Sequence, residues 1–535
     1  MQKATKFWRN ILTAGFAAAV LIFTLSCGAK PVSREAGKTY ELVIMHTNDH
    51  HGSTLANQSK GGLAERATFI KSVRAEGKSV LLLDAGDFNT GSALSNMFDA
   101  APDIVAYNMM GYDAATFGNH EFDGDLDKLV SQIATADYPF VSSNVKTADG
   151  SFLGGHQYIV KEYDGIRVGI FGLTTCRTPT IASPDASLTF LNEIDAARDA
   201  VKKLRKKEKV DIVIALTHIG DVKEDAQHIT SPEVAAAVAG IDIIVDGHSH
   251  SFFEKPLIVI DASNTGNGGN TYIVSANEWG KYVGKGNLSV VDGKLTSFDW
   301  QPIEITGAQF EGDAEIANFL QPFVEKANAS LKEVVGQAAE EFAFGARLPR
   351  YGETALGNMI CDANAWYIRD VFKQEIDFAF HNGGNIRAAL PAGPITMEQV
   401  LTILPFENYL WIASLKGSQL QEFFDFIATV PQGAGGFPQF SKEVRYTVDK
   451  TAGDGVITDL TIGGQAIDSE KTYRFCTNDY LLKGGDGYVA LTKTVDPLNT
   501  SLLLSYTVCE YIKHIGGTIS PALDGRMSVV GGITP

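Results

Sequence analysis

Acidic, histidine and asparagine side chains recur at one kind of position in the first half of this chain, directly after short apolar runs. Asp49 and His51 stand two residues apart at the end of the first run. In an extended chain residues i and i+2 face the same side, so a carboxylate and an imidazole can converge there. The carboxyl ends of strands in an α/β sheet are where ligands bind. Four later runs end in the same way, with Asp87, with Asn119 and His120, with His218, and with His248 and His250.

Carboxylate oxygens mixed with imidazole nitrogens suit zinc, manganese or iron better than calcium or magnesium alone. Two such ions about 3.5–4 Å apart and bridged by one carboxylate can activate a water and stabilise a phosphoryl transition state. Each residue also has an ordinary interpretation, because a strand-end Asp often caps a turn and a single His is often a core or surface residue. Five strand ends of this kind, in order, favour the metal interpretation and predict phosphate ester hydrolysis.

Apolar strand patterns and helical patterns alternate along the same half. This alternation predicts an α/β domain in which helices cover the outer faces of the sheets. The expected strands cover residues 40–45, 79–84, 113–117, 166–172, 210–216 and 241–245, and the main helical patterns cover 63–75, 101–110 and 194–208.

The sequence pattern changes twice after the last metal-type motif. Residues 255–305 read as short strands with Gly- and Asn-rich turns, and 313–335 is a long helical pattern. We therefore expect a first domain over 39–312, a linking helix over 313–335 and a smaller α/β domain over 336–535.

The N-terminus reads as an export signal. Residues 1–27 combine a basic start with an apolar stretch too short for a stable membrane span. Cys27 directly after that stretch favours a lipoprotein signal with a lipidated thiol, and 28–38 would be a tether. Thr24 departs from the usual Leu, so an ordinary secretory signal is the alternative. Free thiols and disulfides both fit the remaining cysteines, which are Cys176, Cys361, Cys476 and Cys509.

The chain of 535 residues carries a formal net charge of -18. Such a surface repels polyanions, which excludes a nucleic-acid polymer as partner. A small phosphorylated molecule is compatible with it, because bound cations reverse the local field. Any membrane contact is expected only through the lipid anchor, and the oligomeric state stays open.

Four segments together resemble the motifs of calcineurin-like metallophosphoesterases. More closely, they resemble the exported bacterial 5′-nucleotidase/UDP-sugar hydrolase family, and the similarity extends over nearly all of 40–530. It implies an N-terminal layered αββα metallophosphoesterase domain followed by a C-terminal α/β substrate-binding domain. The segments are 46–52 (HTNDHHG), 86–91 (GDFNTG), 118–123 (GNHEFD) and 247–250 (GHSH).

The resemblance also implies roles for single residues. His120 would act on the phosphoryl group, and Asp123 would orient it, although Asp123 could also cap the next helix. Asp87 would bridge the two ions, and some relatives have Gln where His250 stands. The first ion would be held by Asp49, His51, Asp87 and His250, and the second by Asp87, Asn119, His218 and His248.

The expected substrate residues come from the second domain. Arg350 and Arg387 would bind phosphate, with Asn382 in the Arg387 loop, where Asn385 replaces a glycine of the family. Phe406 and Tyr480 would stack on a base, although relatives commonly have Phe at the second position, and Asp486 would bind the ribose.

The expected activity is hydrolysis of nucleoside 5′-monophosphates outside the cytoplasm, extending to UDP-sugars or nucleoside di- and triphosphates. Because metals and nucleoside would lie on different domains, turnover requires the domains to close. One alternative is a 2′,3′-cyclic-nucleotide 2′-phosphodiesterase/3′-nucleotidase. Another is a nucleotide-binding lipoprotein with an inactive metal centre. The enzyme would be anchored in the membrane and face the periplasm or cell surface, or be soluble in the periplasm.

Overall fold

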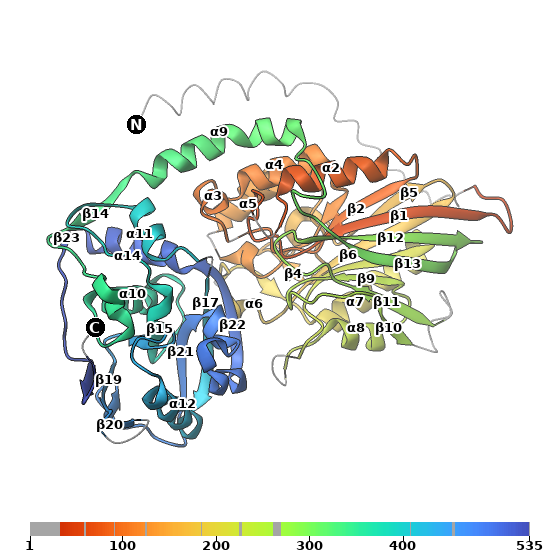
Figure 1. Cartoon of the computed structure of the whole chain (residues 1–535). Helices are drawn as coiled ribbons and strands as arrows, with labels where there is room; N and C mark the ends of the chain where they lie inside the picture. The colour runs from red at the N-terminus through yellow and green to blue at the C-terminus, as the bar shows by residue number, and fades with distance from the viewer. Residues whose placement is uncertain are drawn as a thin grey trace.

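The computed structural model describes residues 33–57, 60–89, 91–123, 126–182, 184–223, 227–260, 269–406, 408–451 and 455–533. The predicted signal, Cys27 and most of the tether lie outside the described residues. Figure 1 shows two α/β bodies joined along one helix, so the predicted fold class is confirmed. None of the helices in the described ranges is long and apolar enough to cross a membrane.

The first domain is built on two sheets that face each other. One has the order β13-β12-β1-β2-β3 and the other β10-β11-β9-β8-β6-β5. The strands of the first sheet are β1 (Thr39–Thr47), β2 (Val80–Asp84), β3 (Ala114–Ala115), β12 (Tyr282–Val291) and β13 (Lys294–Glu304), and those of the second are β5 (Tyr158–Tyr163), β6 (Ile166–Thr174), β8 (Ile212–His218), β9 (Ile243–Asp246), β10 (Leu257–Ile260) and β11 (Asn270–Val274).

Side-chain alternation along β1 explains the layering. Leu42 and Ile44 point into a core shared with β8 and β9 of the other sheet. Val43 and Met45 point the opposite way and pack on α2 (Leu63–Arg74) and α4 (Ala101–Met110). The second sheet packs its outer face on α7 (Glu193–Lys202) and α8 (Ser231–Ala237). Helix, sheet, sheet and helix thus form the expected four layers.

Parallel pairing brings the strand ends to one edge. Thr47 of β1 lies opposite Asp84 of β2, and Thr217 of β8 lies opposite Asp246 of β9. The loops that leave these strands therefore start side by side. They are the loops that carry the metal-type motifs.

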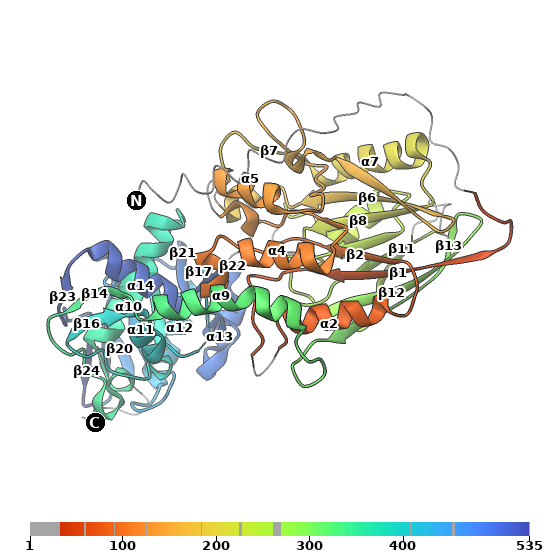
Figure 2. The ribbon, with the colours of Figure 1, turned by 90° about the horizontal axis from the view of Figure 1, so that it is seen from above.

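Helix α9 (Ala314–Leu331) connects the two domains, as Figures 1 and 2 show from two directions. Its N-cap Asp313 accepts a hydrogen bond from the backbone N of Ile316 at 3.2 Å. Only Ile316 and Leu320 are buried among its described residues. The prediction that this helix extends to Val335 was wrong, because β14 (Val334–Ala338) begins there and pairs within the second domain.

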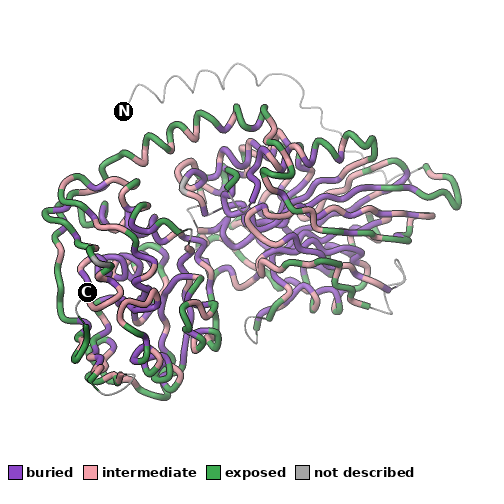
Figure 3. The backbone as a smooth tube through the Cα atoms, viewed as in Figure 1, coloured by how far each residue is buried: buried purple, intermediate pink, exposed green. Residues whose placement is uncertain are grey.

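The second domain has a central sheet of order β18-β15-β21-β17-β22. Phe378 and Phe380 of β15 (Phe378–Asn382) pack on α12 (Gly417–Thr429), whereas Ala379 between them faces α10 (Ala355–Trp366) and α14 (Leu504–Ile515). The other strands are β17 (Tyr409–Lys416), β18 (Pro438–Phe440), β21 (Thr472–Asn478) and β22 (Val495–Leu503). Figure 3 shows a separate buried core in each domain, whereas α9 between them is mostly exposed.

The four cysteines of the described chain are free thiols, which decides the alternative left open by the sequence. Cys361, Cys476 and Cys509 are buried and Cys176 is half-buried. Burial raises the pKa of the Cys176 and Cys509 thiols to about 12.

Candidate metal centre

The seven predicted metal residues come together at the edge where the strands end. Asp87 Oδ2 lies 2.9 Å from His218 Nε2 and 3.8 Å from His51 Nε2. Asp49 Oδ1 lies 3.4 Å from His250 Nε2 and 3.7 Å from His218 Nε2. The two carboxylates thus share His218, and each also lies beside one other histidine.

Asn119 and His248 are the remaining members of the seven, and their side chains contact each other. His248 Nδ1 is 2.8 Å from the side-chain oxygen of Asn119. His51 Nε2 is 3.1 Å from His250 Nε2. Three overlapping groups of potential ligand atoms result: Asp49, His51 and His250; Asp49, Asp87 and His218; and His51, Asp87 and His120.

Outer hydrogen bonds orient three of the rings. Nδ1 of His218 lies 2.8 Å from the carbonyl of Ala85, and Nδ1 of His51 lies 3.2 Å from that of Asn89. Nδ1 of His250 contacts the Glu278 carboxylate. When Nδ1 donates to such an acceptor, Nε2 presents its lone pair toward Asp49 and Asp87, as in metal-ligating histidines.

Charge at the cluster fits a cation site. Burial raises the pKa of Asp49 and Asp87, but the neighbouring histidines lower each pKa further, so both groups are anionic. Burial lowers the pKa of His51 and His248 to about 3, which leaves neutral imidazoles. Burial also lowers the pKa of His218 and His250, but Asp87 and Asp49 raise it to about 10, so without metal these two imidazoliums compensate the carboxylates. Divalent cations can provide the same compensation in a site of this donor chemistry.

His120, which is buried beside His51 and Asp87, forms a pair with Asp123. Their Nδ1 and Oδ2 atoms are 2.5 Å apart. Burial lowers the pKa of His120, but Asp123 and Asp87 raise it to about 9. Asp123 follows the short 3-10 turn His120–Phe122, and α5 (Leu126–Thr135) begins beyond the undescribed residues 124–125.

The predicted substrate residues form a second cluster, in the C-terminal domain. Asp486 accepts from Asn382 Nδ2 at 2.8 Å and from the Tyr480 hydroxyl at 3.0 Å. The Arg387 guanidinium lies 5.4 Å from the centre of the Phe406 ring. Burial lowers the pKa of Arg350, and the charge of Arg387 contributes to that shift, so the two guanidiniums are neighbours.

The two predicted stacking rings flank one polar bridge. Asn408 Nδ2 donates to Asp479 Oδ1 at 3.0 Å, which joins the segment after Phe406 to the residue before Tyr480. Phe406 is 49% exposed and Tyr480 46%, so both rings have a face available. Asn385, which replaces a family glycine, lies in the 3-10 turn Gly383–Asn385, and its amide donates to Asn408 Oδ1 at 2.8 Å.

A cavity of about 1020 Å³ lies between the domains at the metal cluster. Its N-terminal wall includes Asp87, Asn119, His120 and His250. Its C-terminal wall comes from β17, β21 and β22 and from Lys483, and none of the six predicted substrate residues lines it. The structure thus assembles both clusters but does not place one over the other.

Comparison with known proteins agrees with this architecture. The model for the calcineurin-like phosphoesterase family matches residues 42–252, and that for the 5′-nucleotidase C-terminal domain matches 334–493. A 5′-nucleotidase of Vibrio vulnificus is 32% identical over 94% of this chain and 96% of its own length. The chain belongs to the 5′-nucleotidase family. The protein UshA of Escherichia coli is 30% identical over 94% of this chain and 96% of its own length.

Solved structures extend this 5′-nucleotidase assignment. A 5′-nucleotidase precursor from Thermus thermophilus, 28% identical, covers 92% of this chain and all of its own, with a TM-score of 0.56. The NAD nucleotidase of Haemophilus influenzae, 21% identical, shares the fold with a TM-score of 0.76, over 92% of this chain and 99% of its own. The chain is a hydrolase of the 5′-nucleotidase type, and its calcineurin-like domain implies divalent metal ions.

Three acidic or hydroxyl residues at the site were not predicted. Glu121 accepts from the backbone N of Asp87 at 2.8 Å and of Gly118 at 2.6 Å, so it fixes two metal loops together. Glu278 contacts His250, and Ser501 Oγ lies 3.3 Å from His120 Nε2. Glu121 stands within a metal motif that could have indicated a role. Glu278 and Ser501 stand in no motif.

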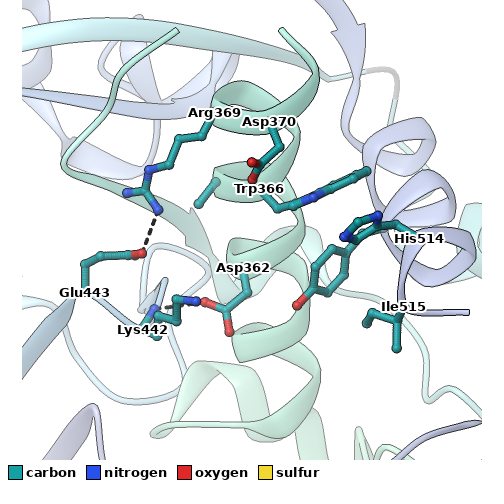
Figure 4. Close-up of a pocket in the computed structure, with 10 residues that line it drawn as sticks. Asp362, Trp366, Arg369, Asp370, Lys442, Glu443, His514 and Ile515 are labelled. Carbon is teal, nitrogen blue, oxygen red and sulfur yellow. Dashed lines mark hydrogen bonds and ion pairs between the residues drawn. The ribbon is translucent and has the colours of Figure 1, made fainter. Parts of the chain in front are cut away.

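A second cavity, of about 420 Å³, lies in the C-terminal domain between the ends of α10 and α14. Figure 4 shows Trp366 beside His514, and an ion pair between Arg369 and Glu443 at 2.6 Å. Arg369 also donates to the carbonyl of Ile376 at 2.9 Å. Arg369 and Glu443 thus pair with each other and with the backbone, and no predicted substrate residue lines this cavity.

Proposed function

We propose that this chain hydrolyses nucleoside 5′-monophosphates to nucleoside and phosphate with two divalent ions, zinc, manganese or similar. One observation carries the substrate choice: two half-exposed aromatic rings, Phe406 and Tyr480, beside the Asn382–Asp486 pair. Stacking on such rings stabilises a bound base by about 1–3 kcal/mol. The free oxygen positions of Asp486 can accept hydrogen bonds from ribose hydroxyls.

The proposed roles in the metal centre follow the family resemblance and are supported by the closeness of these side chains. Asp49, His51, Asp87 and His250 would hold one ion and Asp87, Asn119, His218 and His248 the other. When bound, such a pair activates water and polarises the phosphoryl oxygens. Arg350 and Arg387 would bind the phosphate from the second domain, since guanidinium groups match phosphate oxygens bidentately.

His120 and Asp123 would handle the leaving group. Asp123 accepts from Nδ1 and fixes the ring, so Nε2 is directed at the cavity. From there a protonated His120 can stabilise the developing charge or donate its Nε2 proton to the departing ribose oxygen.

Turnover in this proposal requires the domains to move. The predicted substrate residues of the C-terminal domain, called here the nucleoside cluster, must move next to the metal cluster. The contact between Ser501 and His120 must break in the same motion. We place the hinge after α9, between Leu331 and Val334, because the helix ends there and few of its residues are buried. The proposed second domain accordingly begins at Val334, and the first covers 39–312.

The proposal extends to UDP-sugars and nucleoside di- and triphosphates, which offer the same phosphate and base. A relative in Bacillus subtilis is named trifunctional nucleotide phosphoesterase. From the sequence of residues 1–27 we further propose export and lipidation at Cys27. Mass spectrometry of the mature N-terminus tests that step.

The function is tested by phosphate release from AMP, UMP, 3′-AMP, 2′,3′-cyclic AMP, ADP and UDP-glucose, with Mn²⁺ or Zn²⁺ and with a chelator. We expect AMP and UMP to be cleaved only with metal. Phe406→Ala should mainly raise KM for nucleotides, whereas Asp87→Ala should stop turnover of every substrate. Cleavage of the cyclic ester without cleavage of 5′-monophosphates would establish the 3′-nucleotidase alternative instead, and metal binding without turnover would establish the binding-protein alternative.

A further inference from the structure

The segment 276–281, which follows β11, wraps around one half of the metal centre. Asn277 Nδ2 donates to the carbonyl of His250 at 2.9 Å, and the backbone N of Trp279 donates to the carbonyl of Asp49 at 2.6 Å. Asn48 Nδ2 bridges the Asp49 carboxylate and the carbonyl of Asn277, at 2.6 Å to each. This segment therefore contacts two of the proposed ligands of the first ion.

Glu278 lies inside this segment with both carboxylate oxygens engaged. One oxygen contacts His250 Nδ1, and the other accepts from Lys281 Nζ at 3.0 Å. The side chain is only 14% exposed. Lys281 Nζ in turn lies 4.4 Å from the centre of the Trp279 ring. Packing and pairing together hold the Glu278 carboxylate in one orientation toward His250.

His250 needs such a partner more than the other histidines do. His51 and His218 direct Nδ1 to backbone carbonyls, whose positions are set by the strand ends. His250 comes from a loop, as His51 does, but it keeps 16% of its side chain exposed, whereas the side chains of His51 and His218 are fully buried. Without an acceptor for Nδ1, its ring could rotate or carry the proton on Nε2 and lose its lone pair toward Asp49.

We propose that Glu278 is a positioning residue for the metal subsite formed by Asp49, His51 and His250. It accepts the Nδ1 proton of His250, which leaves the Nε2 lone pair directed into the subsite, 3.4 Å from Asp49 Oδ1. Its negative charge also increases the basicity of the ring and adds to the attraction for a cation. The inference rests on the proposed two-metal function and assigns this role to a residue outside every motif.

The test measures metal binding directly, without substrate. Metal-free protein is titrated with Mn²⁺ by calorimetry, and bound metal is counted by mass spectrometry. Glu278→Ala should lower the affinity for one of the two ions about 10–100-fold, the usual effect of losing such a partner, and leave the affinity for the other ion unchanged. Glu304→Ala is the matched control, because Glu304 is exposed on β13 and forms no ion pair within the described chain.

A second pair of variants separates positioning from a general structural role. Gln at position 250 offers a carbonyl oxygen to the ion but has no second ring nitrogen to anchor. In a His250→Gln background, Glu278→Ala should therefore change Mn²⁺ affinity by less than about threefold, since the coupling between the two sites is gone. A structural role would cost the same affinity in both backgrounds.

The possible failures are distinguishable. If Glu278→Ala binds both ions as tightly as Glu304→Ala, or loses equal affinity in both backgrounds, the positioning role is overturned while the two-metal centre stands. If the unsubstituted protein binds fewer than two ions, the two-metal proposal is overturned and this inference with it. Thermal unfolding of each metal-free variant identifies any that fails to fold. In that case Glu278→Gln, which keeps the side-chain volume, must show the same selective loss, and its absence overturns the proposal.

Discussion

His120 differs from the other histidines of the site in where its ring nitrogens point. The proposed ligands His51, His218 and His250 turn Nε2 toward Asp49 or Asp87. His120 instead anchors Nδ1 on Asp123 and has Nε2 at the interdomain cavity, 3.3 Å from Ser501 Oγ. A ring held in this way can exchange a proton with substrate without being consumed as a ligand.

The first residue-scale prediction concerns this pair. His120→Asn and Asp123→Asn should each lower kcat by about 10²–10⁴, the usual contribution of general acid catalysis, with the larger loss at His120. Because the two residues act as one unit, the double variant should be no slower than His120→Asn. Steady-state kinetics on AMP with saturating Mn²⁺ measures this, and metal content serves as the control. Additive losses would show that Asp123 works independently of His120.

At this scale the sequence predicted what the motifs contain. Six of the seven metal-type residues and the dyad stand in the motif segments, His218 ends an apolar run, and the structure brings them together. Glu278 could not be predicted, because it lies 28 positions after His250 in a segment without a motif and acts only through folding.

The loops of the metal centre carry unusual backbone conformations. Asp49, His51, Asp87, His248 and His250 have positive φ, between 45° and 81°. Non-glycine residues held there cost stability and persist at functional sites because the surroundings impose them. These strand-end turns are therefore shaped for the positions of their side chains and against the preference of the backbone.

This strain predicts an unusual order of stabilities. In metal-free protein, His248→Gly should be more stable than His248→Ala by about 1 kcal/mol, because glycine accepts a φ of 81° without steric cost. Chemical denaturation measures the difference, and both variants should lose metal. Asn119, whose φ is -76°, is the matched control. There the glycine variant should be the less stable of the two, and the same order at both positions would contradict the strain at His248.

Elements of the fold were predictable where periodicity was strong. The buried strands β1, β2, β6, β8 and β9 lie within a few residues of their apolar patterns. The end of α9 was missed because Val334 and Val335 continue an apolar pattern, whereas pairing of β14 with β16 (Gly393–Thr396) decides their conformation. Pairing between segments far apart in sequence is not visible in a local pattern.

At the scale of the whole molecule, the metal cluster and the nucleoside cluster lie on different domains. The cavity at the metal cluster has a C-terminal wall of β17, β21 and β22, and Trp279 of the first domain stacks on Tyr409 of the second at 5.0 Å between ring centres. The nucleoside cluster lies elsewhere on the second domain. The sequence predicted that two domains must close on each other, but their relative placement depends on such contacts and was not predictable.

Locking the domains in this arrangement should stop turnover. Val222→Cys and Lys483→Cys, in a Cys176→Ser background, place thiols on opposite walls of the cavity. Joined by a reducible bis-maleimide, the protein should keep its metals and lose more than about 90% of kcat on AMP, because closure is part of the cycle. Reduction should restore activity, and each single cysteine variant treated alike is the control. Undiminished activity of the joined protein would overturn the proposed closure.

If the proposed roles hold, the placement of the metal cluster and the predicted base-binding residues on different domains has an evolutionary consequence. Substitutions on one domain can alter which alcohol is released while the machinery that breaks the P–O bond stays intact. A lineage could therefore diversify its nutrient range by drift in the second domain alone. Conversely, damage to Phe406 or Tyr480 would leave a poorly discriminating phosphatase instead of an inert protein, and such a remnant is raw material for a new specificity.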